Sequence, residues 1–173
     1  MQEVLKVLKE RRSIRKYTKE LVSKEVLEQI LEAGMYAANG KNCQAASMVV
    51  TQNPELIAKL SKLNAQVMGT DTDPFYGAPT VVMVFADPER PTWLQDGSLV
   101  MGNLMNAAHA LGVDSCWINR ATEVFDSEEG KALMRDWGID ERLRGVGNCI
   151  LGYRDCEYPK AKPRKENFVT WVD

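Results

Sequence analysis

Residues 11–17, "RRSIRKY", gather positive charge near the start of the chain. Three arginines and one lysine fall within six positions, and Ser13 adds a hydroxyl group among them. Guanidinium groups and a hydroxyl are suited to binding a phosphate, which accepts several charge-assisted hydrogen bonds. The segment is therefore a candidate anion site, and the competing interpretation is an ordinary solvated surface.

A second basic run lies near the other end of the chain. Its four cations are Lys160, Lys162, Arg164 and Lys165. Either run alone is explained by solvation at the surface, whereas two runs that converged in space would form one phosphate site. The sequence leaves both interpretations open.

The common catalytic templates are not found in the sequence. In "GVGNCILG", Asn148 occupies the third glycine position of a dinucleotide-binding motif, and no P-loop is present. The single histidine, His109, lies among alanines in a predicted helix, and the four cysteines lack metal-binding spacing. We therefore predict neither a catalytic triad nor a metal site. A protein with an anion site and no catalytic side-chain group can take its chemistry from a bound cofactor.

The composition predicts one compact domain that spans residues 1–173. The chain is 45% hydrophobic and has 22 basic against 24 acidic residues, a balance that counts against a nucleic-acid partner. Scattered cysteines fit a reducing cytosol, and neither an apolar signal segment nor a membrane-spanning run is found. We therefore expect a soluble, cytoplasmic protein without a membrane partner.

Hydrophobic periodicity and capping residues predict an α+β domain. The predicted helices cover residues 2–10, 23–37, 53–63, 96–111 and 127–138, and the predicted strands cover residues 46–52, 80–86, 113–118 and 146–154. The predicted N-cap residues are Ser23, Asn53 and Asp96. The strand at residues 80–86 is apolar throughout, so we expect it at the buried centre of the sheet.

The end of the chain is unusually apolar for an isolated subunit. Its large apolar side chains are Phe168, Val169, Trp171 and Val172. Exposed together, they would form an apolar surface of a kind that marks an interaction site. Two interpretations stay open: the segment packs on a partner subunit, or it forms a last strand on its own sheet.

Five segments in succession carry a resemblance to a known family. They are "RRSIRKY" after a short helix, "AANGKNCQ" before a strand, "FYGAPTVVMVFAD", "DGSLVMGNLMNAAHALGVDSCWI", and "ILGYR" followed by "KPR". From about residue 3 to residue 170, the chain resembles the nitroreductase family of FMN flavoproteins. The resemblance implies a nitroreductase-like α+β fold, with a central, mostly antiparallel sheet flanked by helices. It also implies an intertwined homodimer with FMN at the subunit interface.

The activity that the resemblance implies is that of an FMN-dependent NAD(P)H oxidoreductase. NADH or NADPH gives a hydride to N5 of FMN, and the electrons pass to a nitroaromatic, a quinone or a similar small-molecule acceptor by a ping-pong mechanism. Hydride transfer between two bound rings needs geometry and no protein nucleophile, so we predict no catalytic side chain. The alternative is a non-catalytic FMN-binding or flavin-handling protein. A nucleic-acid module is disfavoured by the near-neutral charge balance.

The resemblance assigns several residues to the phosphate end of FMN. Arg11 and Ser13 match the family's phosphate and ribityl segment, and Arg12 between them is also assigned to cofactor binding. Lys162 and Arg164 match the basic pair that completes the phosphate site.

Other residues are assigned to the flavin ring. Arg15 matches a cation near the pyrimidine edge, where it would stabilise the negative charge of the reduced ring. Asn39 and Asn42 match a polar loop that reaches the flavin from the neighbouring subunit. The residues that match the segment whose backbone lies against the ring are Trp117, Asn119 and Arg120. The backbone amide near Asn119 is expected to point at N5.

Overall fold

The structure is a computed structural model in which residues 2–172 are described. Its helices are α1 (Gln2–Glu10), α2 (Lys24–Met35), the 3-10 turn η1 (Gly40–Asn42), α3 (Pro54–Met68), α4 (Trp93–Ala110), α5 (Ala121–Asp126) and α6 (Glu128–Asp136). Its strands are β1 (Ala46–Thr51), β2 (Thr80–Ala86), β3 (Asp114–Ile118) and β4 (Arg144–Gly152). The predicted α+β class is confirmed.

The strands of the described residues form one sheet in the order β1-β2-β4-β3, and all neighbouring strands are antiparallel. Every residue of β2 is buried, as its apolar sequence predicts. The register between β2 and β4 shifts once, between Val84 and Phe85. The prediction of a mostly antiparallel central sheet is confirmed.

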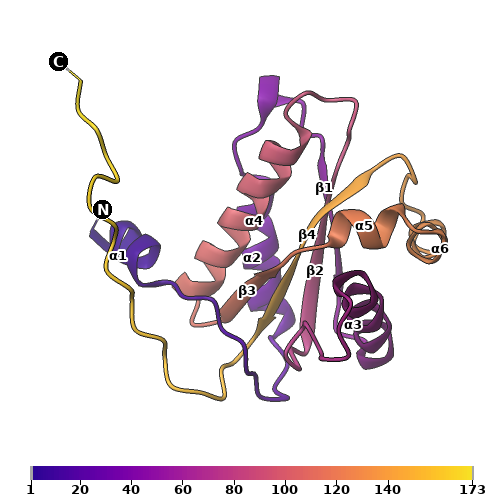
Figure 1. Cartoon of the computed structure of the whole chain (residues 1–173), viewed down its shortest axis with the longest axis horizontal. Helices are drawn as coiled ribbons and strands as arrows, with labels where there is room; N and C mark the ends of the chain where they lie inside the picture. Colours follow the sequence, from indigo (N-terminus) through magenta and orange to yellow (C-terminus); the bar gives the residue numbers. More distant parts are fainter. Residues whose placement is uncertain (1, 173) are drawn as a thin grey trace.

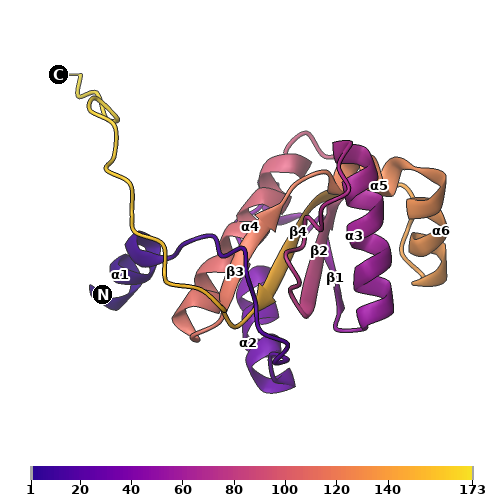
Figure 2. The same ribbon diagram turned by 60° about the horizontal axis from the view of Figure 1, so that its bottom comes forward.

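Helices cover both faces of the sheet, as Figure 2 shows. α2 and α4 pack on one face, around a core that includes Ile30 and Leu104. α3, α5 and α6 pack on the other face, where the core includes Leu60, Phe85 and Phe125. The strands contribute to both cores because successive side chains of a strand point to opposite faces.

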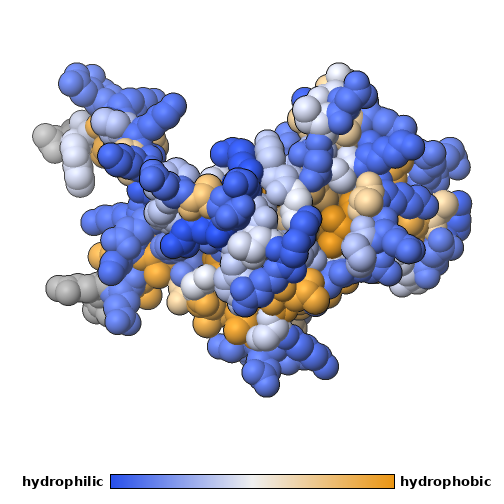
Figure 3. All heavy atoms as spheres, turned by 90° about the horizontal axis from the view of Figure 1, so that it is seen from below, coloured by the Kyte–Doolittle hydropathy of each residue, from blue (hydrophilic) through white to orange (hydrophobic). Residues whose placement is uncertain are grey.

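α1 and the C-terminal segment lie outside the sheet and the helices that pack on it. Figures 1 and 2 show α1 to one side of the sheet, with the C-terminal segment running past it. The end of that segment projects away from the rest of the molecule in the space-filling view (Figure 3). Trp171, near its end, has an exposed fraction of 89%. Up to residue 172 the chain forms no strand after Gly152, so the alternative of a last strand on its own sheet is wrong.

Two of the predicted N-caps are confirmed. The Ser23 hydroxyl accepts the N–H of Val26 at 3.3 Å and so caps α2. The Asn53 side chain accepts the N–H of Glu55 at 2.9 Å, and Pro54 occupies the first position of α3. These local signals fix the two helix starts because they satisfy N–H groups that have no partner inside a helix.

One local prediction is wrong, and one helix was not predicted. Asp96 is not an N-cap, because α4 begins at Trp93 and follows Thr92, so Asp96 lies one turn inside the helix. Helix α5 was not predicted from the sequence. It has only six residues and starts after Arg120, whose φ is 75°, and so short a segment shows no helical periodicity.

Candidate cofactor site

Two segments from opposite ends of the chain run side by side. We call residues 11–18 the arm and residues 153–172 the tail. The Thr18 N–H donates to the carbonyl of Tyr153 at 2.8 Å, so the arm and the start of the tail share a backbone hydrogen bond. Figures 1 and 2 both show the two segments following each other toward α1.

The arm is also attached to the edge strand β3. Ser13 pairs with Ser115 in an isolated parallel bridge, and the Ile14 N–H donates to the Ser115 carbonyl at 3.0 Å. The Ile14 side chain is completely buried, which anchors the arm in the core beneath β3. The backbone on either side of Ile14 is therefore held against β3.

One tyrosine closes the contact between the two segments. The Tyr158 hydroxyl accepts the N–H of Arg12 at 3.0 Å and donates to the carbonyl of Glu10 at 2.9 Å. The segments at opposite ends of the sequence are therefore in contact from Tyr153 to Tyr158 of the tail.

Two guanidinium atoms at this meeting point have unused donors. Within the described residues, Arg11 Nη1 and Arg12 Nε are buried and have no hydrogen-bond partner. A buried polar group without a partner costs about 1–3 kcal/mol. Both groups can donate and cannot accept, so the partner that would satisfy them is an acceptor, and an anion suits them best.

The two cations predicted for the tail are exposed. Lys162 and Arg164 lie beyond Tyr158, and the Arg164 guanidinium donates to the Lys162 carbonyl at 2.7 Å. Both residues belong to the tail, which Figure 1 shows passing α1. They belong to the same region as the arm, but no contact between them and Arg11 or Arg12 is found among the described residues.

The side chains of the arm also converge on one thiol. Burial raises the pKa of Cys116, while the charges of Arg15 and Arg11 and a hydrogen bond from Ser13 act to lower it. Arg15 itself is exposed. The three predicted residues therefore lie together beside β3, with Arg15 free to reach a ligand at the surface.

The end of β3 and the two residues after it form the next predicted part of the site. Trp117 is half-buried, and its indole lies so close to Gly147 that a Cβ at that glycine would come within 2.5 Å of Nε1. Asn119 and Arg120 are exposed, and Arg120 forms an ion pair of 2.9 Å with Glu123.

The predicted asparagine loop lies elsewhere in the same chain. Asn39 and Asn42 belong to residues 39–44, at the end of α2 opposite to the arm (Figure 1). The Asn39 side chain accepts the N–H of Gln44 at 2.9 Å, which closes the loop on itself. One chain therefore does not bring these asparagines to the arm.

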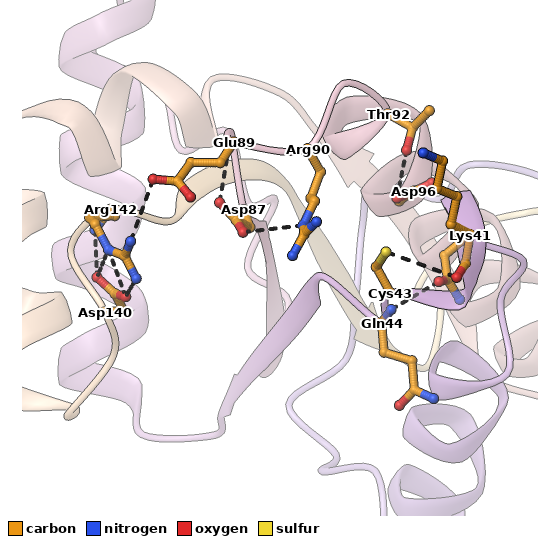
Figure 4. Close-up of polar contacts among 11 residues, drawn as sticks. Lys41, Cys43, Gln44, Asp87, Glu89, Arg90, Thr92, Asp96, Asp140 and Arg142 are labelled. Carbon is orange, nitrogen blue, oxygen red and sulfur yellow. Dashed lines mark hydrogen bonds and ion pairs between the residues drawn. The ribbon is translucent and has the colours of Figure 1, made fainter.

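The asparagine loop rests on a buried carboxylate. Figure 4 shows Asp96 and Thr92 next to the loop that carries Lys41, Cys43 and Gln44. The Asp96 side chain is 3% exposed and accepts the N–H of Gly40, which no local sequence signal indicates.

Two cavities of the described residues differ in whether predicted site residues line them. The smaller, of about 470 Å³, is bounded by α2, α4 and β1 and includes Asn39 and Asp96 in its wall. The larger, of about 880 Å³, lies between α3 and residues 70–79, and none of the predicted site residues lines it. The candidate site is the arm with the adjoining tail, because the buried unused donors lie on the arm and Tyr158 of the tail contacts it.

Residues 2–172 show neither a metal-binding cluster nor a membrane-spanning helix. No cluster of three or more His, Cys, Asp or Glu side chains is arranged to hold a metal ion. No helix there has the length and apolar character required to cross a membrane.

Sequence reasoning missed two residues that shape the site. Tyr158 was not singled out, because a single aromatic residue in the polar stretch "CEYPK" gives no distinguishing signal. Ser115 was read only as part of a strand, yet its carbonyl holds the arm. Both act through contacts between residues far apart in the sequence.

Comparisons with known proteins all point to one family. The sequence model of the nitroreductase family matches residues 8–74 and 66–153. A candidate NADH dehydrogenase/NAD(P)H nitroreductase of Archaeoglobus fulgidus is 34% identical over 159 residues, which are 88% of this chain and 86% of that protein.

Solved structures give the same result. A nitroreductase with bound FMN from Bacteroides fragilis is 28% identical with a TM-score of 0.92, and the match covers all of both chains. A nitroreductase with bound FMN from Desulfitobacterium hafniense is 27% identical with a TM-score of 0.89, again over all of both chains.

Proposed function

Because the chain belongs to the nitroreductase family, we propose that it is an FMN-dependent NAD(P)H oxidoreductase. Residues 1–173 form one FMN-binding domain. When bound, FMN supplies the redox chemistry, taking a hydride from NADH or NADPH and giving electrons to a nitroaromatic, quinone or similar acceptor in a ping-pong cycle. The four free thiols fit a cytoplasmic location, where cysteines stay reduced.

The observation that carries this proposal is the pair of buried, unused donors on the arm. Arg11 Nη1 and Arg12 Nε match a phosphate, which offers several acceptor oxygens and negative charge. Lys162 and Arg164 add two exposed cations on the adjoining tail. The residues present therefore fit the phosphate end of FMN.

The remaining assigned residues fit the ring end. Arg15 is exposed beside β3, where its cation stabilises negative charge on the pyrimidine edge. The half-buried Trp117 and the exposed Asn119 and Arg120 belong to the segment that would offer backbone groups to the ring. None of these residues acts as a nucleophile, which agrees with chemistry that belongs to the cofactor.

The working unit is a homodimer with FMN at the subunit interface. Asn39 and Asn42 belong to a loop that lies away from the arm of its own chain, which supports their assignment to the site of the second chain. The exposed apolar side chains at the end of the tail supply a surface for that contact, because burying them is favourable by about 25 cal/mol per Å².

The test is steady-state oxidation of NADH and NADPH by the purified protein, with a quinone or a nitroaromatic as acceptor. Parallel lines in double-reciprocal plots are expected for a ping-pong cycle. A protein that retains FMN and never turns over would identify a non-catalytic flavin-binding protein. A protein that retains no flavin would remove the proposal altogether.

A further inference from the structure

The ring of Tyr158 is held between the arm, α4 and the start of the tail. The His109 ring of α4 stacks on it, with centroids 6.0 Å apart and planes 13° from parallel. The Arg154 guanidinium lies 5.0 Å from the centre of the same ring. Arg154 is itself fixed by an ion pair of 3.1 Å with Asp114, whose side chain is 5% exposed. The position of the hydroxyl is therefore set by packing.

The Tyr158 hydroxyl uses all of its hydrogen-bonding capacity. A phenol has one proton to donate and two lone pairs to accept with. The Glu10 carbonyl can only accept, so it takes the proton, and the Arg12 N–H can only donate, so it uses one lone pair. The third contact of the hydroxyl is with His109 Nδ1 at 3.4 Å.

These contacts control the residue that lies between them. The Glu10 carbonyl and the Arg12 N–H belong to the two peptide groups on either side of Arg11. The Tyr158 hydroxyl is therefore hydrogen-bonded to both peptide groups. The Glu10 carbonyl lies at the end of α1, where carbonyl groups have no partner within the helix. The direction in which the Arg11 side chain leaves the backbone follows from this arrangement.

We propose that Tyr158 is a positioning residue for phosphate recognition: its hydroxyl orients Arg11 and Arg12 and joins them to the tail that carries Lys162 and Arg164. This inference rests on the proposed function, because the anion concerned is the FMN phosphate. Tyr158 does not touch the ligand. It sets the geometry of the cations that do, and a preorganised site loses less entropy on binding.

The consequence is a selective effect on the phosphate. Tyr158→Phe keeps the ring and its stacking but removes the hydroxyl, so the Arg12 N–H and the Glu10 carbonyl lose a common partner. FMN carries the phosphate and riboflavin lacks it. The variant should weaken FMN binding about tenfold and leave riboflavin binding unchanged. A purely structural role for the hydroxyl would weaken both flavins equally.

The experiment measures displacement of FMN from the holoprotein by riboflavin, which reports the ratio of the two affinities. For Tyr158→Phe, about tenfold less riboflavin should displace half of the FMN. Tyr153→Phe is the matched control, because it removes the same group five residues earlier, where no side-chain hydrogen bond is found within the described residues. The control should leave the ratio at the wild-type value.

Two further measurements separate the possible outcomes. In the holoprotein of Tyr158→Phe, amide hydrogen exchange at Arg12 should become faster. His109→Ala, which leaves the hydroxyl in place and removes its third contact, should shift the ratio in the same direction by about threefold. An unchanged ratio in both variants would overturn the role of Tyr158 while FMN retention by the wild type still supported the proposed function. A wild-type protein that retained no FMN would overturn both.

Discussion

The Asp96 carboxylate accepts the backbone N–H of Gly40 at 2.9 Å and the hydroxyl of Thr92 at 3.0 Å. The contact joins α4 to the asparagine loop across 56 positions of sequence. The loop contains strained positions that need such support, since Lys41 and Asn42 have φ values of 54° and 53°. Asp96 therefore fixes a loop that we assign to the flavin site of the second subunit.

We expect Asp96→Ala to destabilise the protein, because it leaves the Gly40 N–H without its acceptor. A hydrogen bond to a charged group contributes about 1.5–3 kcal/mol, so the free energy of unfolding should fall by that amount. Asp96→Asn is the control, since its amide oxygen can still accept from Gly40, and its loss should be clearly smaller. Urea unfolding measures both, and equal midpoints for wild type and Asp96→Ala would contradict the role of the carboxylate.

The same loop should reject a side chain at position 40. A Cβ added to Gly40 would lie 2.3 Å from Thr92 Oγ1, well inside contact distance. Gly40→Ala should cost about 1–3 kcal/mol through overpacking, and Thr92→Ala should reduce that cost by removing the hydroxyl. Gly102→Ala provides the contrast, because nothing lies within 4 Å of its Cβ and alanine favours the helix. Thermal unfolding should rank Gly102→Ala above the wild type and Gly40→Ala below it.

Much of the fold was predictable because its signals are local. The Asn53 cap and the apolar run of β2 act within a few residues, and both are confirmed. Asp96 shows where local reasoning fails: an acidic residue suits both an N-cap and the first turn of a helix, and its actual partner, Gly40, is distant in sequence. The sequence alone therefore did not place the start of α4 at Trp93.

The candidate site was predictable in residue type and only partly in geometry. The basic residues of the arm were identified from "RRSIRKY", and the structure brings the arm and tail together. The residue that joins them, Tyr158, gave no signal, because a single aromatic residue in a polar tail has many possible roles. The assignments of Asn39 and Lys162 to FMN stay predictions, since they concern a ligand and a second subunit.

We expect Arg11→Ala to weaken FMN retention, because it removes one of the buried guanidinium donors. The expected loss is roughly 1.5–3 kcal/mol, which is about tenfold to a hundredfold in Kd. Arg135→Ala is the control. Arg135 lies on α6, away from the arm, and forms an ion pair with Glu141. The fluorescence of the flavin that is released when the holoprotein is diluted measures the change in Kd. Equal Kd values for Arg11→Ala and the wild type would place the phosphate elsewhere.

Alkaline pH should destabilise the folded chain through a buried thiol. Cys149 has no exposed surface, and burial raises its pKa from 9.0 to about 12. The folded state therefore favours the neutral thiol, so its stabilising contribution is full below pH 9 and is lost as pH rises toward 12. The slope is roughly 1.4 kcal/mol per pH unit within this window.

Urea unfolding at several pH values above 9 measures that slope. Cys149→Ala should be less stable at neutral pH, where it leaves a small cavity, but it should lose less stability as the pH rises. Cys156→Ala is the control, because that thiol is exposed and its removal should leave the slope unchanged. A slope that is the same in Cys149→Ala and the wild type would contradict the assignment.

The apolar end of the tail should determine the oligomeric state. Phe168 and Trp171 have exposed fractions of 70% and 89%, and burying each on a second chain would contribute about 2 kcal/mol. The double variant Phe168→Asp/Trp171→Asp should raise the dimer dissociation constant at least about a hundredfold. Thr170→Asp adds charge to the same segment without removing apolar area, so it should stay dimeric. Sedimentation equilibrium distinguishes these outcomes, and a double variant whose dissociation constant equals that of the wild type would show that the end of the tail does not hold the proposed dimer together.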